Sequence, residues 1–303
     1  MHLIERTLGG AATATLQRAA RTLSLVMALG LTSLAVAQAP FPTAAAATDA
    51  LIDAIATNDT AAMPRILGND WRRMLPAGGV DIDDVYRFLA KAHESRRVDV
   101  NGSRGFLVIG SDPWTLPIPI LQASDGQWRF DPVGARGAIA ERRIGRNERR
   151  AINAALAYVD AQRDYAAADR NGDGVLEYAQ KLLSSPGRRD GLIWSASLGD
   201  ESPLGTAYVP ADARQAHGYR YRIVTAQGPA ASGGARNYII GKRMTAGFAL
   251  IAWPERFGET GVMTFIVSND GKVFERNLGP RTHQAAADIR TFNPDDAWKP
   301  ARP

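Results

Sequence analysis

The sequence contains no cysteine, and this absence excludes several kinds of site. Without thiols there is no disulfide, no thiolate-bound zinc and no cysteine nucleophile. Histidine is scarce too, and none of His93, His217 and His283 has the H-x-x-x-H spacing of a helical zinc site. The fold must therefore be stabilised by an apolar core and, if by any metal, by a hard ion with oxygen ligands.

Motifs of the common enzyme classes are also missing. The sequence has no G-x-S-x-G elbow, H-E-x-x-H helix, Walker loop or S-x-x-K element. Ser195 has no recognisable base near it in the sequence, and the pair Asp295-Asp296 follows Pro294 in what is expected to be a solvated tail. These absences favour a binding or interaction role over catalysis and predict no catalytic residue.

Long apolar runs are confined to the N-terminus. Arg18 and Arg21 precede the run Leu23 to Ala35, and Ala35-Val36-Ala37 supplies the small residues of a signal-peptidase site. The run is shorter than the ~20 residues that span a bilayer. Residues 1–37 are thus predicted to be a cleaved secretory signal, which places the protein in the periplasm or outside a bacterial cell, with no transmembrane helix after cleavage.

The remaining composition is that of a globular protein with a mild positive charge. The 303 residues carry a formal net charge of +5, with 45% hydrophobic and 22% charged residues. The densest basic run, Arg136 to Arg150, is interrupted by Glu141 and Glu148. We interpret it as a solvated helix start, with a patch for an anion or an acidic partner as the alternative, and we expect no nucleic-acid partner.

Composition and periodicity predict an α+β protein of two domains. The predicted segments are a signal peptide (1–37), a flexible mature N-terminus (38–47), a small α+β domain (48–134), a linker (135–146) and a second α+β domain (147–303). In the first domain, helices near 48–56, 61–67 and 82–95 precede strands at 106–109, 114–121 and 127–131. Helices followed by a curved antiparallel sheet are similar in order to the cystatin-like or NTF2-like cone.

The second domain is predicted to begin with two helices. Asn147 is expected to cap a long helix that ends at Asp169, and a shorter helix carrying Leu176 and Leu183 follows. A four-stranded antiparallel meander then covers 219–226, 246–253, 261–267 and 272–277, with a hairpin signal at 269–271.

The loop between these two helices contains the one motif with metal chemistry. The residues from Asp169 fit the calcium-loop pattern D-x-[DN]-x-[DN]-G, in which alternate side chains converge on one point. The predicted ligands are Asp169, Asn171, Asp173, the Val175 carbonyl, Glu177 and Gln180.

Gln180 stands where calcium loops carry a bidentate glutamate, so any calcium affinity should fall to ~10⁻⁴ to 10⁻³ M. The alternative is an Asx-type turn that joins the helices without an ion. If calcium binds, its role is expected to be structural, and no other cofactor is expected.

Several segments together resemble one known family. Residues 143–148 (RIGRNE), 158–165 (YVDAQRDY), the loop 169–177, residues 225–229 (TAQGP) and residues 261–267 (GVMTFIV) are similar to the bacterial domain-of-unknown-function family 2950. The likeness covers about 50–298, implies a location outside the cytoplasm and carries over no catalytic residue. The second half alone also resembles the globular heads of type II pseudopilins, although a separate domain stands where pseudopilins have a membrane helix.

From the sequence we therefore expect an exported envelope protein that binds a protein or another envelope component, with a structural calcium loop. Two alternatives remain open. One is a periplasmic hydrolase of glycan or peptide that uses carboxylates, and the other is a structural subunit associated with secretion or a pilus.

Overall fold

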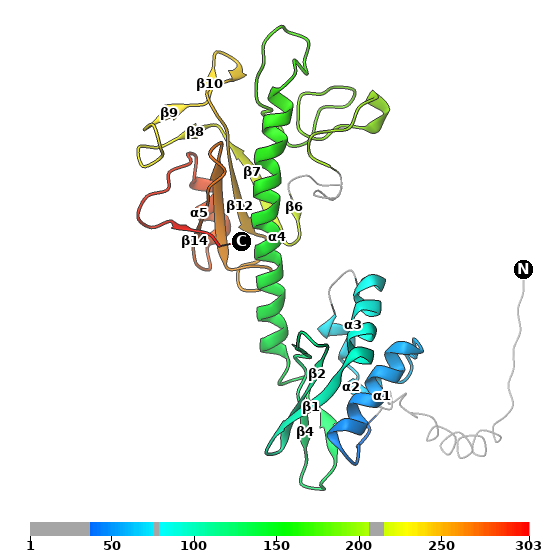
Figure 1. Cartoon of the computed structure of the whole chain (residues 1–303). Coiled ribbons are helices and arrows are strands. Elements are labelled where there is room, and N and C mark those ends of the chain that lie inside the picture. Colours follow the sequence, from blue (N-terminus) through cyan, green and yellow to red (C-terminus); the bar gives the residue numbers. More distant parts are fainter. Residues whose placement is uncertain (1–36, 76–78, 206–214, 303) are drawn as a thin grey trace, which may run out of the picture. The chain divides into compact units, whose positions relative to one another are not determined.

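The computed structural model describes residues 37–75, 79–205 and 215–302. They form two compact units (Figure 1): the first holds the described residues up to Trp114 together with Ile120–Phe130, and the second holds Thr115–Pro119 and the described residues from Asp131 onward. The predicted signal, 1–37, lies outside the described residues except for Ala37. Within the described ranges, no helix is long and apolar enough to cross a membrane.

The first unit packs helices on an antiparallel sheet, as the sequence predicts. Its helices are α1 (Ala44–Ala56), α2 (Met63–Leu67), the short 3-10 helix η1 (Trp71–Met74) and α3 (Ile82–Glu94). Its strands are β1 (Arg96–Asn101), β2 (Arg104–Ile109), β3 (Trp114–Thr115), β4 (Ile120–Gln122) and β5 (Trp128–Phe130), in the order β1-β2-β4-β5 with β3 beside β2. Both α1 and α3 contact the sheet, and the core between them includes Leu51, Leu107 and Phe130.

The N-terminal segment 38–47, predicted to be flexible, is instead part of the first unit. Phe41 pairs with Trp128 through two backbone hydrogen bonds of 2.9 and 2.8 Å, and the Gln38 amide donates to the carbonyls of Ile66 and Phe130. The side chain of Thr43 caps α1 by accepting from Ala46. The prediction was wrong because the alanine run favours a helix and its small side chains pack closely in the core.

Strand β1 has no counterpart in the sequence-based prediction. Its polar and apolar residues alternate from Arg97 to Asn101, but its burial does not, since all but Val98 are exposed. Charged side chains such as Arg96, Arg97 and Asp99 are typical of an edge strand, where they discourage pairing with another chain. The full antiparallel register with β2 establishes it as a strand.

The second unit places the long helix α4 (Arg136–Ala166) against a sheet in the order β15-β14-β13-β12-β7-β6. These strands are β6 (Gln215–Ala216), β7 (Tyr219–Val224), β12 (Ala249–Pro254), β13 (Met263–Ser268), β14 (Val273–Asn277) and β15 (Lys299–Pro300). The predicted four-stranded meander is confirmed in β7, β12, β13 and β14. Every residue of β12 is buried because α4 packs on one face and α5 (Thr282–Asp288) on the other.

Short elements complete this unit around one end of α4. They are the 3-10 helix η2 (Ala196–Leu198) and two small antiparallel pairs, β8 (Ala226–Gln227) with β9 (Arg236–Asn237), and β10 (Ile239–Ile240) with β11 (Arg243–Met244).

Helix α4 begins and ends earlier than predicted. The residues expected to form the linker 135–146 are helical from Arg136 onward, and the helix ends at Ala166 instead of Asp169. Asn147 does not cap a helix start; its side-chain amide donates to the Thr260 carbonyl at 2.9 Å. Its role is therefore to fix the middle of α4 to the loop before β13.

Candidate metal-binding loop

The predicted calcium loop follows α4 directly and has no regular secondary structure. Two of its glycines adopt positive φ, 76° at Gly172 and 83° at Gly174, so the chain turns sharply where the motif predicts. Asp169 organises this turn: its Oδ1 accepts from the Gly172 amide and its Oδ2 from the Gly174 amide, both at 2.8 Å. The amide of Gly174, followed by other backbone amides, lowers the pKa of Asp169 and keeps it ionised.

Asn171 bridges the two other carboxylates of the loop. Its Nδ2 donates to Glu177 Oε1 at 2.5 Å and to Asp173 Oδ2 at 3.3 Å. Two carboxylate oxygens therefore share one donor. A half-turn of the Asn171 amide brings its oxygen to the position of this donor and leaves three oxygens around it, at the cost of the hydrogen bond that Oδ1 accepts from the Asp173 amide at 3.1 Å.

Glu177 is the least satisfied member of this group. Its Oε2 is buried and has no hydrogen-bond partner among the described residues. Burial, and then the negative charge of Asp173, raise the pKa of Glu177 above its ordinary value, although the Met244 amide and the charge of Arg243 act in the opposite direction. An ionised carboxylate oxygen without a donor, close to a second carboxylate, is stabilised by any cation placed beside it.

One such cation is already present on the neighbouring hairpin. Arg243 Nε in β11 donates to Asp173 Oδ2 at 3.0 Å. This ion pair is partly exposed and neutralises only one of the three loop carboxylates. It also ties the loop to the β10–β11 hairpin, so the position of Asp173 depends on a residue far away in the sequence.

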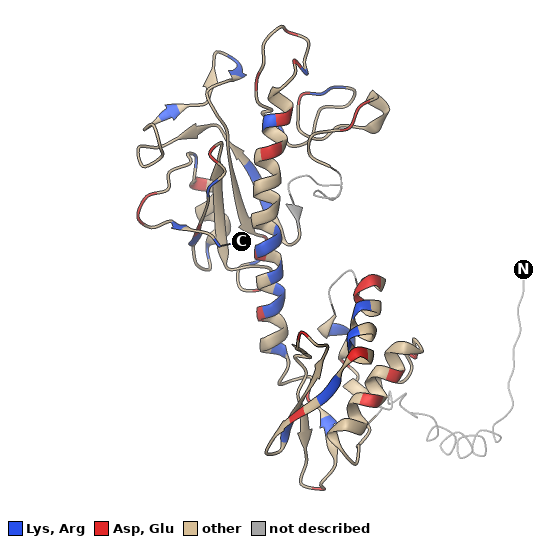
Figure 2. Ribbon diagram, viewed as in Figure 1, with Lys and Arg blue, Asp and Glu red and all other residues tan. Residues whose placement is uncertain are grey.

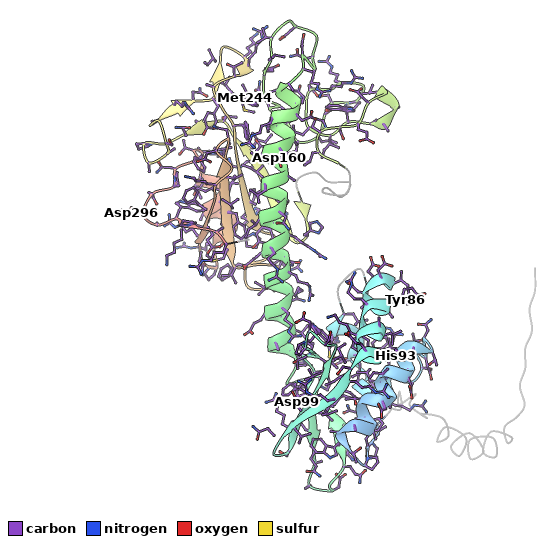
Figure 3. The ribbon with its side chains drawn as sticks, in the orientation of Figure 1. Tyr86, His93, Asp99, Asp160, Met244 and Asp296 are labelled. Carbon is purple, nitrogen blue, oxygen red and sulfur yellow. The ribbon has the colours of Figure 1, made fainter. Side chains whose placement is uncertain are left out.

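The far end of the loop is fixed by buried hydrogen bonds. Gln162 of α4, which is 0% exposed, donates to the Ala179 carbonyl and accepts from the Ala179 amide, both at 2.8 Å. The Tyr178 amide donates to the carbonyl of Met244, labelled in Figure 3, and the Tyr178 ring meets Phe248 edge-on. The loop thus has a rigid end at 178–179 and a turn at 169–174 made of its own hydrogen bonds.

The structure brings some of the predicted ligands together and separates others. Asp173, Asn171 and Glu177 meet directly, and Asp169 contacts the Asp173 amide at 3.3 Å. The Val175 amide donates to Asp173 Oδ1. Gln180 turns away, because its Nε2 donates to the Lys242 carbonyl. In the described part of the chain, no three acidic or histidine side chains are grouped closely enough to hold a metal ion without rearrangement.

The second helix predicted after the loop does not form. Tyr178 bridges to Met244 and Leu183 to Ile193, so this segment is extended. Leu176, which was expected on this helix, is 57% exposed. The loop is therefore not the centre of a helix-loop-helix. Neither Gln162 nor Arg243 was foreseen, because nothing in a single sequence signals a contact with a residue so far along the chain.

The other candidate groups belong to other elements. His93 is exposed near the end of α3 (Figure 3), and His283 accepts a hydrogen bond from Trp253 at Nδ1. Ser195 caps η2 by accepting from the Ser197 amide. A hollow of about 420 Å³ in the first unit is lined by residues of α1, α2 and the turn between them, including Asp53, Asp59 and Arg65.

Comparisons with known proteins identify one match. A family model described as a protein of unknown function, DUF2950, matches residues 38–301. No curated protein and no solved structure shows a significant match. The likenesses to cystatin-like cones and pseudopilin heads consequently carry no further argument.

Proposed function

The chain belongs to DUF2950, a family of proteins of unknown function, and we propose that it is an exported, non-enzymatic binding protein of the bacterial envelope whose 169–180 loop binds a structural calcium ion. The observation that carries the calcium proposal is the buried Oε2 of Glu177, which has no described donor. It lies beside Asp173 at a turn that fits the calcium-loop pattern through its sixth position.

Calcium would bind by a small rearrangement of groups that already meet. The Asn171 amide turns its oxygen toward the point between Asp173 and Glu177, and Arg243 gives up Asp173 Oδ2 to the ion. The carboxylate of Asp169 and the Val175 carbonyl lie on the same short segment and can complete a set of oxygen ligands. Gln180 joins only if it releases the Lys242 carbonyl, so we expect the weak affinity of extracellular modules.

The binding role follows from what the loop holds in place. Leu176 in the loop is 57% exposed, and Ile240 in the adjoining hairpin is 64% exposed. Large apolar side chains held in the open by a fixed loop suit contact with a protein or another envelope component. An ion that stiffens the loop would reduce the entropy lost when this surface binds.

The calcium proposal is tested by calorimetric titration of the chain from Gln38 onward, and by its melting temperature with calcium and with chelator. We expect saturable heat and a higher melting temperature at millimolar calcium. Glu177→Gln should abolish both effects, whereas Asp296→Asn, which removes an exposed carboxylate outside the loop, should leave them unchanged. Absence of heat and of any shift in the unaltered protein would remove the proposal.

Export is tested separately by fractionation of cells that express the full chain. We expect the mature protein, shortened by the leader, in the periplasm or the medium. Full-length protein retained in the cytoplasm would contradict export without affecting the calcium result.

A further inference from the structure

The first residue of the predicted mature chain is held by its side chain. Gln38 is half-buried, and its Nε2 donates to the carbonyl of Ile66 at 2.9 Å and to the carbonyl of Phe130 at 2.7 Å. A glutamine amide carries two N–H donors, so both of them are used. The side chain therefore joins the end of α2 to β5.

The end of α2 explains why a donor is needed at this place. The helix ends at Leu67, so the carbonyls of its last turn have no following turn that could donate to them. The Ala39 amide donates to the Arg65 carbonyl at 2.6 Å, next to the bond that Gln38 makes to Ile66. The start of the predicted mature chain thus caps α2.

Neutral hydrogen bonds and burial hold this segment in place. Phe41 pairs with Trp128 through two backbone hydrogen bonds of 2.9 and 2.8 Å. Residues 38–48 contain no charged side chain, and Figure 2 shows the start of the described chain in tan up to the first acidic residue of α1. Because the segment forms no ion pair, salt should not release Gln38.

Removal of the leader after Ala37 would give Gln38 a free α-amino group, and an amino-terminal glutamine can react with itself. The α-amino nitrogen attacks Cδ, so that the bond between this nitrogen and Cδ forms and the Cδ–Nε2 bond breaks. Nε2 leaves as ammonia, with one proton taken from the α-amino group. The product is pyroglutamate, and no second reactant is needed.

The fold opposes this reaction in two ways. The five-membered ring forms only if Cδ is free to approach the α-amino nitrogen, and the two hydrogen bonds of Nε2 restrict that movement. The leaving nitrogen must also take up a proton, and the carbonyl oxygens beside it have none to give. Cyclisation would finally deprive both carbonyls of the donor that they share, which costs free energy.

We propose that the fold protects the amino-terminal Gln38 from cyclisation and keeps the α-amino group of the mature protein free. This inference rests on the predicted cut after Ala37, which is part of the proposed export, and it does not depend on the calcium loop. The side chain reacts only when it is detached from both carbonyls. Two hydrogen bonds of ordinary strength should therefore make cyclisation on the order of 10- to 100-fold slower in the folded chain than in the unfolded chain.

The test follows the loss of one ammonia molecule by mass spectrometry. A fusion protein is cut by a protease that leaves Gln38 as the first residue, and the chain is incubated at neutral pH either folded or in guanidinium chloride. A peptide of residues 38–45, measured in both solvents, supplies the effect of the denaturant itself. We expect the unfolded chain and the peptide to lose ammonia and the folded chain to keep it. Equal rates in the folded and unfolded chains, after this correction, would overturn the proposal.

Two substitutions at one position test the attachment without altering Gln38. Phe41→Pro removes the amide that donates to the Trp128 carbonyl, so the folded variant should cyclise on the order of 5-fold faster than the unaltered protein. Phe41→Ala keeps that amide and should react more slowly than Phe41→Pro. Circular dichroism checks that both variants are folded. If Phe41→Pro cyclised no faster than the unaltered protein, the attachment of this segment would not be the source of protection.

The mass of the exported protein distinguishes this inference from export itself. A chain that begins at Gln38 and retains its ammonia supports both. A chain that begins with pyroglutamate contradicts the protection and leaves export intact. A cut at another position also contradicts the inference, because Gln38 would then have no free α-amino group, while secretion would still stand.

Discussion

Two buried glutamines fix the loops of the second unit. Gln162 holds both backbone groups of Ala179, and Gln227 donates to the carbonyls of Ser232 and Gly234 while its Oε1 accepts from Tyr238. A buried amide that lost such partners would cost about 1 to 3 kcal/mol for each unsatisfied group. Both glutamines belong to segments that carry the family resemblance. The hydrogen bonds of the two glutamines therefore give a structural reason for the presence of glutamine in each of these segments.

Asp190 is a third residue whose side chain holds a loop of the second unit in place. Its lowered pKa makes the stability of the protein depend on pH. Burial acts to raise the pKa of Asp190, but hydrogen bonds from Lys181 Nζ and from the amide and hydroxyl of Ser185 outweigh it and lower the pKa to about 2. A lowered folded-state pKa contributes stability above the unfolded value of 3.8 that is lost as pH falls toward 2. We expect Asp190→Asn to reduce the free energy of unfolding at pH 7 by about 1 kcal/mol, the linkage value discounted for solvent screening.

Urea unfolding at a series of pH values checks this expectation. The difference between Asp190→Asn and the unaltered protein should shrink steadily below pH 4. Asp160→Asn, which alters an exposed carboxylate paired at 3.4 Å, provides the control and should change little at any pH. A constant deficit from pH 7 to pH 2 would show that the carboxylate charge of Asp190 is not the stabilising feature.

From the sequence, the role of a residue that hydrogen-bonds within its own segment can be predicted better than the role of a residue that contacts a distant segment. The positive φ of Gly172 and Gly174 and the Asp169 turn follow from local chemistry and were anticipated. Arg243 reaches Asp173 only because the hairpin and the loop are packed together. No spacing rule links two positions so far apart, so a contact of this kind becomes visible only in the fold.

At the scale of elements, the α1 region shows how a local composition can mislead. An alanine- and proline-rich start suggests flexibility, yet Gln38 and Phe41 attach this segment to β5 and the end of α2. We predict that a chain beginning at Thr48 unfolds more easily than one beginning at Gln38, by roughly 3 to 5 kcal/mol. The loss combines the buried first turn of α1 with several hydrogen bonds.

Thermal unfolding of the two chains measures this difference. A chain beginning at Pro40 provides an intermediate case, because it lacks Gln38 but keeps Phe41 and the whole of α1. Equal melting temperatures for the chains that begin at Gln38 and at Thr48 would show that the segment contributes nothing to stability.

The segment after the calcium loop shows the opposite error, a helix predicted where none exists. Its apolar spacing suits a helix, but tertiary hydrogen bonds take up its backbone. The amides of Leu192 and Ile193 donate to the carbonyls of Lys181 and Leu182, and Ser184 donates to Ile193. Short helices are marginal on their own, so such pairing readily overrides the periodic pattern. The strands of the meander were predictable because each pairs with the next long strand along the chain.

At the scale of the whole molecule, each unit has its own apolar core. Phe130 is 2% exposed among residues of the first unit, and Phe265 is 1% exposed in the core of α4 and its sheet. The chain passes between the units more than once, since Thr115–Pro119 belongs to the second unit while both flanks belong to the first. Separate cores favour separate unfolding events, each governed by its own buried side chains.

Differential scanning calorimetry of the chain from Gln38 onward should therefore show two transitions. Replacing a buried phenylalanine by alanine costs about 3 to 5 kcal/mol. Phe130→Ala should lower one transition and Phe265→Ala the other, each leaving its counterpart nearly in place. Calcium, if it binds the 169–180 loop, should raise only the transition that Phe265→Ala lowers, because the loop is fixed to α4 and the hairpin of the second unit. A single transition lowered by both substitutions would mean that the two cores unfold as one cooperative structure.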